Sequence, residues 1–105
     1  MAIREILEEE LENALRMEER YSEALNQLPR GSLVKKQVKG RPYYYIVLRD
    51  DEGKVKLIYK GKADANEVKR YKAIKEKRAQ YRNLRAKVRA QIRFIRRALR
   101  APTTV

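Results

Sequence analysis

The chain has 105 residues, 27 of them Lys or Arg and 14 of them Asp or Glu, so its formal net charge is +13. It contains no Cys and no His, which excludes disulfides, thiolate metal sites and cysteine nucleophiles and removes the commonest general base and metal ligand. Such a basic balance implies a polyanionic partner, most often nucleic acid, otherwise an anionic membrane or an acidic protein.

The length suits one domain with a modest core. No apolar run approaches the roughly 20 residues of a membrane span, and the acidic N-terminal sequence lacks the pattern of a signal peptide. We therefore expect a soluble, cytoplasmic protein. Because the sequence has no glycine-rich phosphate loop and no nucleophile motif, we also expect no enzymatic activity and no cofactor.

An acidic helix is predicted first, over residues 3–29. Residues 3–28 contain no Gly or Pro, and Pro29 ends the helix close by. A heptad seam with one polar member runs along it and comprises Leu7, Leu11, Ala14, Glu18, Tyr21, Leu25 and Leu28. Met17 could fill the gap beside Glu18. A seam of this kind requires a partner helix.

Three short strands are predicted within residues 31–62, at Ser32–Lys39, Tyr43–Arg49 and Val55–Lys60. The turns between them lie at residues 39–42 and 50–53, and such short connections make an antiparallel meander. Alternation assigns one apolar face, which comprises Val34, Val38, Tyr44, Ile46, Leu48, Val55, Leu57 and Tyr59. It assigns to the other face Lys35, Gln37, Tyr43, Tyr45, Val47, Arg49, Lys54, Lys56, Ile58 and Lys60.

The second face joins cations to tyrosines without any acid, a composition suited to phosphates and bases. Alternatively, its lysines only keep the strands from pairing with other chains. The acids Asp50, Asp51 and Glu52 gather in one turn, where Asp commonly serves the backbone rather than a divalent ion. We therefore predict no metal site.

A basic helix is predicted over residues 64–101, followed by a tail at 102–105. Asp64 to Glu67 has the spacing of a capping box with Asp as the N-cap. A first apolar stripe comprises Val68, Tyr71 and Ile74, placed to cover the sheet, and a second comprises Tyr81, Leu84, Val88, Ile92, Ile95 and Leu99. A cationic ridge lies one step round the helix and comprises Lys75, Arg78, Arg82, Arg85, Arg89, Arg93, Arg96 and Arg100.

The arginines of this ridge suit two-point binding of phosphate, or of glutamates from the first helix. Residues 1–30 carry a net charge of −4 and residues 63–105 carry +11, so pairing between the helices leaves an excess of positive charge. The predicted fold is α+β: a long helix, a three-stranded antiparallel β-meander and a long helix. The helices form an antiparallel, coiled-coil-like hairpin with Tyr81 near Leu25 and Leu99 near Leu7.

The meander carries the motifs G-S-L-x-K-K, G-R-P-Y-Y-Y, G-K-V-K and Y-K-G-K, with Arg49 between the second and the third. It resembles a module of small uncharacterised prokaryotic proteins, where the module lies between two helices. More distantly, it resembles the three-stranded sheet of tyrosine-recombinase N-terminal domains, which lies in the DNA major groove. The second resemblance implies that Lys35, Tyr43, Tyr45, Arg49 and Lys56 face DNA. The long flanking helices depart from the recombinase module, and nothing resembles the recombinase catalytic domain.

The sequence thus predicts a non-enzymatic nucleic-acid-binding protein, with DNA favoured over RNA. The predicted binding residues are Lys35, Arg41, Tyr43, Tyr45, Arg49, Lys54, Lys56, Lys60, Arg82, Arg85, Arg89 and Arg93. An alternative is a helical-hairpin module for protein association without nucleic-acid contact. Phe94 lies off the apolar stripe and favours a homodimer through the helices. Attachment of the basic helix to an anionic membrane is a weaker alternative, because its apolar stripe is needed for the first helix.

Overall fold

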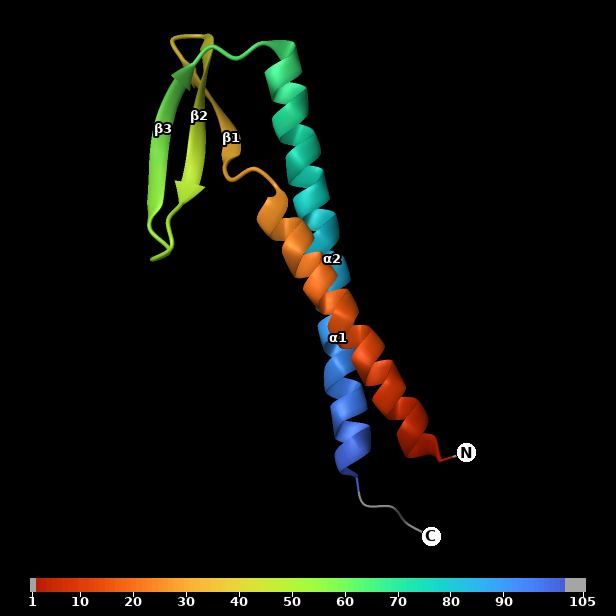
Figure 1. Cartoon of the computed structure of the whole chain (residues 1–105). Helices are drawn as coiled ribbons and strands as arrows, with labels where there is room; N and C mark the ends of the chain where they lie inside the picture. The colour runs from red at the N-terminus through yellow and green to blue at the C-terminus, as the bar shows by residue number, and fades with distance from the viewer. Residues whose placement is uncertain (1, 102–105) are drawn as a thin grey trace. The chain divides into compact units, whose positions relative to one another are not determined.

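A computed structural model describes residues 2–101 of the chain. In chain order its elements are α1 (Ile3–Gln27), β1 (Ser32–Val38), β2 (Arg41–Arg49), β3 (Val55–Gly61) and α2 (Ala65–Arg100) (Figure 1). The α+β order of helix, antiparallel meander and long helix is confirmed. The predicted tail at 102–105 lies outside the described residues.

These elements divide into two compact units. The helical unit comprises residues 2–27 and 79–101 of the described chain, that is α1 and the second part of α2. The sheet unit comprises residues 28–78, that is the meander and the first part of α2. The helix α2 therefore contributes to both units.

An antiparallel hairpin of α1 and α2 makes up the helical unit, as predicted. Ala14, Val88 and Ile92 form its buried cluster, and Leu11 and Tyr21 pack against them. The ring centroids of Tyr21 and Tyr81 lie 6.3 Å apart. The heptad seam of the sequence therefore lies between the two helices.

Two arginines connect the helices at polar positions. The Nη2 atom of Arg4 donates to the carbonyl oxygen of Leu99 at 2.8 Å, which satisfies a carbonyl in the last turn of α2. The Nε atom of Arg89 donates to Glu18 Oε2 at 3.0 Å. Glu18, the polar member of the seam, is thus paired across the hairpin, whereas Met17 is exposed and does not fill the gap.

The strands form one antiparallel sheet in the order β1-β2-β3. Val38 pairs with Arg41, so the first hairpin loop consists of Lys39 and Gly40 alone. Both have positive φ, 52° and 78°, as a type I′ turn requires. The strand β2 therefore begins two residues earlier than predicted and includes Pro42.

This pairing corrects the predicted faces of the sheet. Directly paired residues share a face, and Tyr45 pairs with both Val34 and Tyr59, while Tyr44 pairs with Lys35. The outer face therefore comprises Ser32, Val34, Lys36, Val38, Arg41, Tyr43, Tyr45, Val47, Arg49, Val55, Leu57 and Tyr59. The inner face comprises Leu33, Lys35, Gln37, Pro42, Tyr44, Ile46, Leu48, Lys56 and Ile58. The two edge strands, β1 and β3, are each shifted by one residue relative to β2. Their residues therefore lie on the face opposite to the one predicted.

The first part of α2 faces the inner side of the sheet. Asp64 caps the helix, because its Oδ1 accepts a hydrogen bond from the Glu67 backbone N–H at 2.8 Å. Leu33 and Tyr44 of the sheet line a common pocket with Val68 and Tyr71 of the helix. The first apolar stripe of α2 therefore covers the sheet as predicted. The face that it covers is the inner face, which differs in its residues from the apolar face predicted from the sequence.

Within residues 2–101, neither helix is apolar over a long enough stretch to cross a lipid bilayer.

Candidate nucleic-acid interface

The outer face of the sheet exposes apolar and aromatic side chains in one continuous surface. Leu57 is 65% exposed and Tyr59 is 59% exposed, and Val34, Val38 and Val55 are also exposed. A patch of this kind on a folded protein commonly marks an interaction surface. The sequence pattern had assigned these residues to the apolar face that the basic helix was expected to cover.

Three tyrosines form a cluster at the end of this face near the β1–β2 turn. The ring of Tyr59 lies 5.4 Å from that of Tyr45 and 6.3 Å from that of Tyr43, measured between centroids. The Nζ atom of Lys36 lies 5.8 Å from the centroid of the Tyr45 ring, within cation–π range. The cluster draws one tyrosine from the edge strand β3 and two from the central strand β2.

The predicted binding residues of the sheet divide between its two sides. Arg41, Tyr43, Tyr45 and Arg49 share the outer face, and both arginines are exposed. The structure places Lys35 and Lys56 on the inner face instead, so they do not join the tyrosines. The prediction that all these residues share one face is therefore wrong. The register of β1 and of β3 against β2 differs from the predicted one by one residue.

Lys60 has an internal partner. Because Tyr44 pairs with Gly61 and Tyr45 with Tyr59, Lys60 lies at a β-bulge. Its Nζ atom lies 2.7 Å from Glu67 Oε2, which is buried. The hydrogen bond to Glu67 raises the pKa of Lys60 above its ordinary value. Lys60, predicted to bind nucleic acid, thus forms an ion pair that connects β3 to α2.

A pocket lined by three lysines lies on the inner side of the sheet. Its volume is about 330 Å³, and Lys35 of β1 and Lys72 and Lys75 of α2 line it together with Tyr44 and Tyr71. No acidic residue lines this pocket. It gives the sheet unit a second positive surface, separate from the tyrosine cluster.

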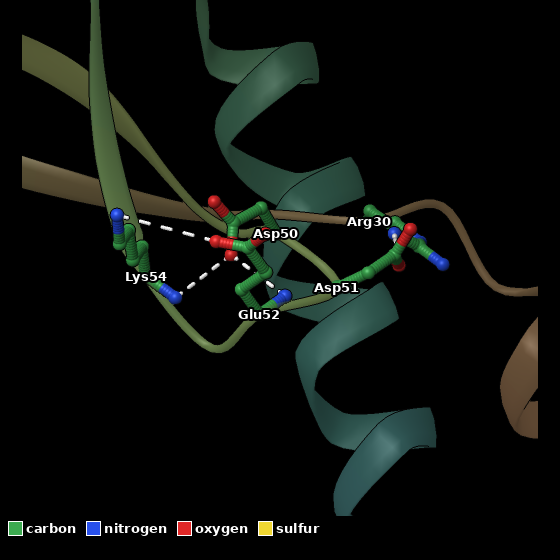
Figure 2. Close-up of polar contacts among 5 residues, drawn as sticks. All are labelled: Arg30, Asp50, Asp51, Glu52 and Lys54. Atoms are coloured by element: carbon green, nitrogen blue, oxygen red, sulfur yellow. Dashed lines mark hydrogen bonds and ion pairs between the residues drawn. The ribbon is translucent and has the colours of Figure 1, made fainter.

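The acidic turn between β2 and β3 is built around one carboxylate. Asp50 Oδ1 accepts hydrogen bonds from the backbone N–H groups of Glu52 at 3.0 Å and Lys54 at 2.8 Å (Figure 2). Asp51 pairs with Arg30 at 3.5 Å, and Lys54 Nζ lies 4.0 Å from Glu52. Among residues 2–101, no group of three acidic residues could hold a metal ion. Asp50 thus serves the backbone of the turn.

The predicted arginine ridge includes two members with internal partners. In the sheet unit, Arg78 is half-buried and its Nη2 donates to the carbonyl oxygens of Pro29 at 2.7 Å and Gly31 at 3.4 Å. In the helical unit, Arg89 pairs with Glu18, as described above. Arg82 and Arg93 are exposed and Arg85 is half-buried. The ridge is therefore part structural support and part free surface.

Positive charge is unevenly divided between the two units. The sheet unit contains 16 Lys and Arg and 6 Asp and Glu, a net charge of +10. The helical unit contains 11 and 8, a net charge of +3, because α1 supplies eight glutamates. None of the six acids of the sheet unit lies in a strand. The charge excess of the protein is thus mainly a property of the sheet unit.

The predicted binding residues do not include Lys36 and Tyr59, which lie in the tyrosine cluster of the outer face. The signal for Lys36 lies in the Lys39-Gly40 dipeptide, because a two-residue loop there pairs Val38 with Arg41 and hence Lys36 with Tyr43. Tyr59 lies opposite Tyr45 because Arg49 pairs with Val55 across the second turn and the register continues unbroken to Tyr45. The bulge at Lys60 comes after this pair.

Residues 4–70 match the model of a protein family described as a domain of unknown function, DUF6788. This match includes α1, the whole meander and the start of α2. Neither the curated proteins nor the solved structures contain a match to the chain.

Proposed function

The chain belongs to the DUF6788 family, and we propose that it is a non-enzymatic nucleic-acid-binding protein whose contact surface is the outer face of the sheet. The observation that carries this proposal is the charge of +10 in the sheet unit, with no acid in any strand. Lys36, Arg41 and Arg49 supply cations on the outer face itself. A surface of this composition attracts phosphates and presents aromatic rings to bases or sugars.

Duplex DNA and single strands are both compatible with a surface of this charge. The likeness of the meander to the recombinase sheet favours duplex DNA, which such a sheet enters through the major groove. The tyrosines favour stacking on unpaired bases. In either case the release of counterions makes the affinity fall as salt rises.

The decisive experiment compares two variants that remove the same charge from opposite faces. Arg41→Gln/Arg49→Gln removes two cations from the outer face, and Lys35→Gln/Lys56→Gln removes two from the inner face. Binding of labelled single-stranded and duplex oligonucleotides is measured by fluorescence anisotropy at several salt concentrations. We expect the outer-face variant to reduce the slope of log K against log[salt] by about 2 on duplex DNA, since each lost phosphate contact removes about 0.9.

The inner-face variant is the matched control and keeps a slope close to that of the wild type. Equal losses in both variants would show that binding follows net charge rather than the outer face. Wild-type protein that binds neither polymer at low salt would remove the proposal altogether.

Exposure of Phe94 favours a second candidate function, association through the helical hairpin. The side chain of Phe94 is 63% exposed, although the neighbouring Ile92 and Ile95 are buried. A homodimer that covers Phe94 would form a four-helix arrangement. Light scattering tests it: a dimer that Phe94→Lys converts to a monomer supports this function, and a monomeric wild type contradicts it.

A further inference from the structure

The tyrosine cluster borders two depressions on the surface of the sheet unit. One has a volume of about 380 Å³ and is lined by Tyr43, Tyr45 and Tyr59 together with Val38 and Lys39. The other has a volume of about 360 Å³, shares Tyr43 and is also lined by Pro42 and Tyr44 of the inner face. Tyr43 therefore stands between two adjoining hollows.

Cations line both depressions. Arg41 and Lys62 line the depression that shares Tyr43. Lys39 lines the depression with the three tyrosines, and Lys36 lies against the ring of Tyr45. No acidic residue lines either depression. Positive groups thus lie beside the tyrosines, where they can attract the phosphates of a nucleic-acid backbone.

The apolar character of this surface discriminates between kinds of nucleic acid. Burial of its exposed aromatic and aliphatic atoms favours binding only when the ligand has apolar faces that remove these atoms from water. The flat faces of bases are stacked on one another inside a duplex, which offers a protein its phosphates and the edges of its base pairs. In a single strand, the faces of the bases can stack on aromatic side chains.

We propose that the tyrosine cluster is a stacking site for single-stranded nucleic acid, with bases on Tyr43, Tyr45 and Tyr59 and phosphates near Arg41 and Lys62. This inference rests on the proposed function and narrows it to one substrate class. A single strand complements the site in charge, since the cations of both depressions meet no acid in their lining.

The test compares single-stranded and duplex oligonucleotides of one sequence by fluorescence anisotropy at near-physiological salt. Deoxyribose and ribose single strands are separate arms, which distinguish DNA from RNA. We expect the protein to bind either single strand at least about 10-fold more tightly than the duplex, because base–aromatic stacking contributes most to the affinity. If Lys39, Arg41 and Lys62 each neutralise one phosphate, the slope of log K against log[salt] on the single strand should be about −2.

Tyr59→Leu keeps an apolar side chain and removes the ring, whereas Tyr59→Phe removes only the hydroxyl group. We expect Tyr59→Leu to weaken single-strand binding about 10-fold and Tyr59→Phe to remain within about twofold of the wild type. Tyr43→Leu provides an independent test if Tyr59→Leu lowers the melting temperature. Equal effects of Leu and Phe at position 59 would overturn the stacking role.

The outcomes separate this inference from the proposed function. Duplex binding as tight as single-strand binding, or tighter, would overturn the single-strand site and leave nucleic-acid binding in place. Absence of binding to every polymer would remove the proposed function itself. A dimer in light scattering that Leu57→Lys dissociates would show that a second copy covers the outer face, and would overturn the inference as well.

Discussion

Among single residues, Gly31 fixes the approach of the chain to the sheet. Its φ is +102°, and a Cβ atom at this position would lie 2.9 Å from Ile46 Cγ2 and 3.0 Å from Leu48 Cδ2. Gly31→Ala therefore combines a left-handed backbone with overpacking of the inner face. We expect it to lower the free energy of unfolding by about 1–2 kcal/mol for the backbone and about 1–3 kcal/mol more for the contacts, as measured by urea unfolding.

Gly53→Ala is the matched control for this prediction. Gly53 has a φ of +82°, but no atom lies within 4 Å of an added Cβ. Its replacement should therefore cost the backbone contribution alone. Equal losses at the two positions would show that Ile46 and Leu48 move aside without cost.

The pair of Lys60 and Glu67 makes stability depend on alkaline pH. Because Glu67 raises the pKa of Lys60 above its ordinary value of 10.5, the pair contributes stability that is fully present below that value. The contribution is lost as pH rises through the higher pKa of the folded state. We expect the difference in melting temperature between the wild type and Glu67→Gln to be constant from pH 7 to about pH 9.5 and to shrink above about pH 10.5.

A difference that already disappears below pH 9 would contradict this expectation. The test uses a difference between two proteins, because the other lysines and the tyrosines also titrate in this range and affect both proteins alike.

Among the elements, the β1–β2 hairpin contains a correctable weakness. Lys39 adopts a φ of 52° at the first loop position of a turn that favours Asn-Gly. Lys39→Asn keeps the turn and relieves the cost of a left-handed lysine, so we expect it to raise the free energy of unfolding by about 0.5–1 kcal/mol. Lys39→Val should lower it, since β-branched residues tolerate positive φ poorly. Thermal unfolding followed by circular dichroism measures both changes, and a stabilising Val would contradict the assigned turn.

The same hairpin explains which part of the site the sequence could predict. Helix seams depend on spacing within one element, and residues such as Ala14, Val88 and Ile92 are buried as the pattern indicates. A sheet face depends on how neighbouring strands align, and a shift of one residue exchanges every side chain between the faces. The alternation within β2 was therefore predictable. The placement of Lys35 required the two-residue loop at Lys39, and the placement of Tyr59 required the pairing of Arg49 with Val55 across the second turn.

At the scale of the whole molecule, the division into two units shows which part of the chain carries the excess positive charge. Composition alone does not indicate this. The sequence predicts more positive charge than the acidic helix can neutralise, without indicating which surface carries this excess. Because α1 and the arginine-rich part of α2 share one unit, most of that unit's charge is matched within it. Pairs such as Arg89 with Glu18 show how the matching occurs. The sheet unit has no acidic helix of its own and keeps its excess.

This distribution predicts a weak effect of the arginine ridge on binding. Arg82→Gln/Arg93→Gln/Arg96→Gln removes three exposed arginines from the helical unit and reduces its net charge from +3 to zero. If the sheet carries the site, the affinity for single-stranded oligonucleotides should change by no more than about twofold, since every cation of the sheet unit remains in place. Anisotropy beside Arg41→Gln/Arg49→Gln provides the comparison. A loss of about 10-fold in the triple variant, together with a smaller slope against log[salt], would place phosphate contacts on α2 and make the ridge part of the binding surface.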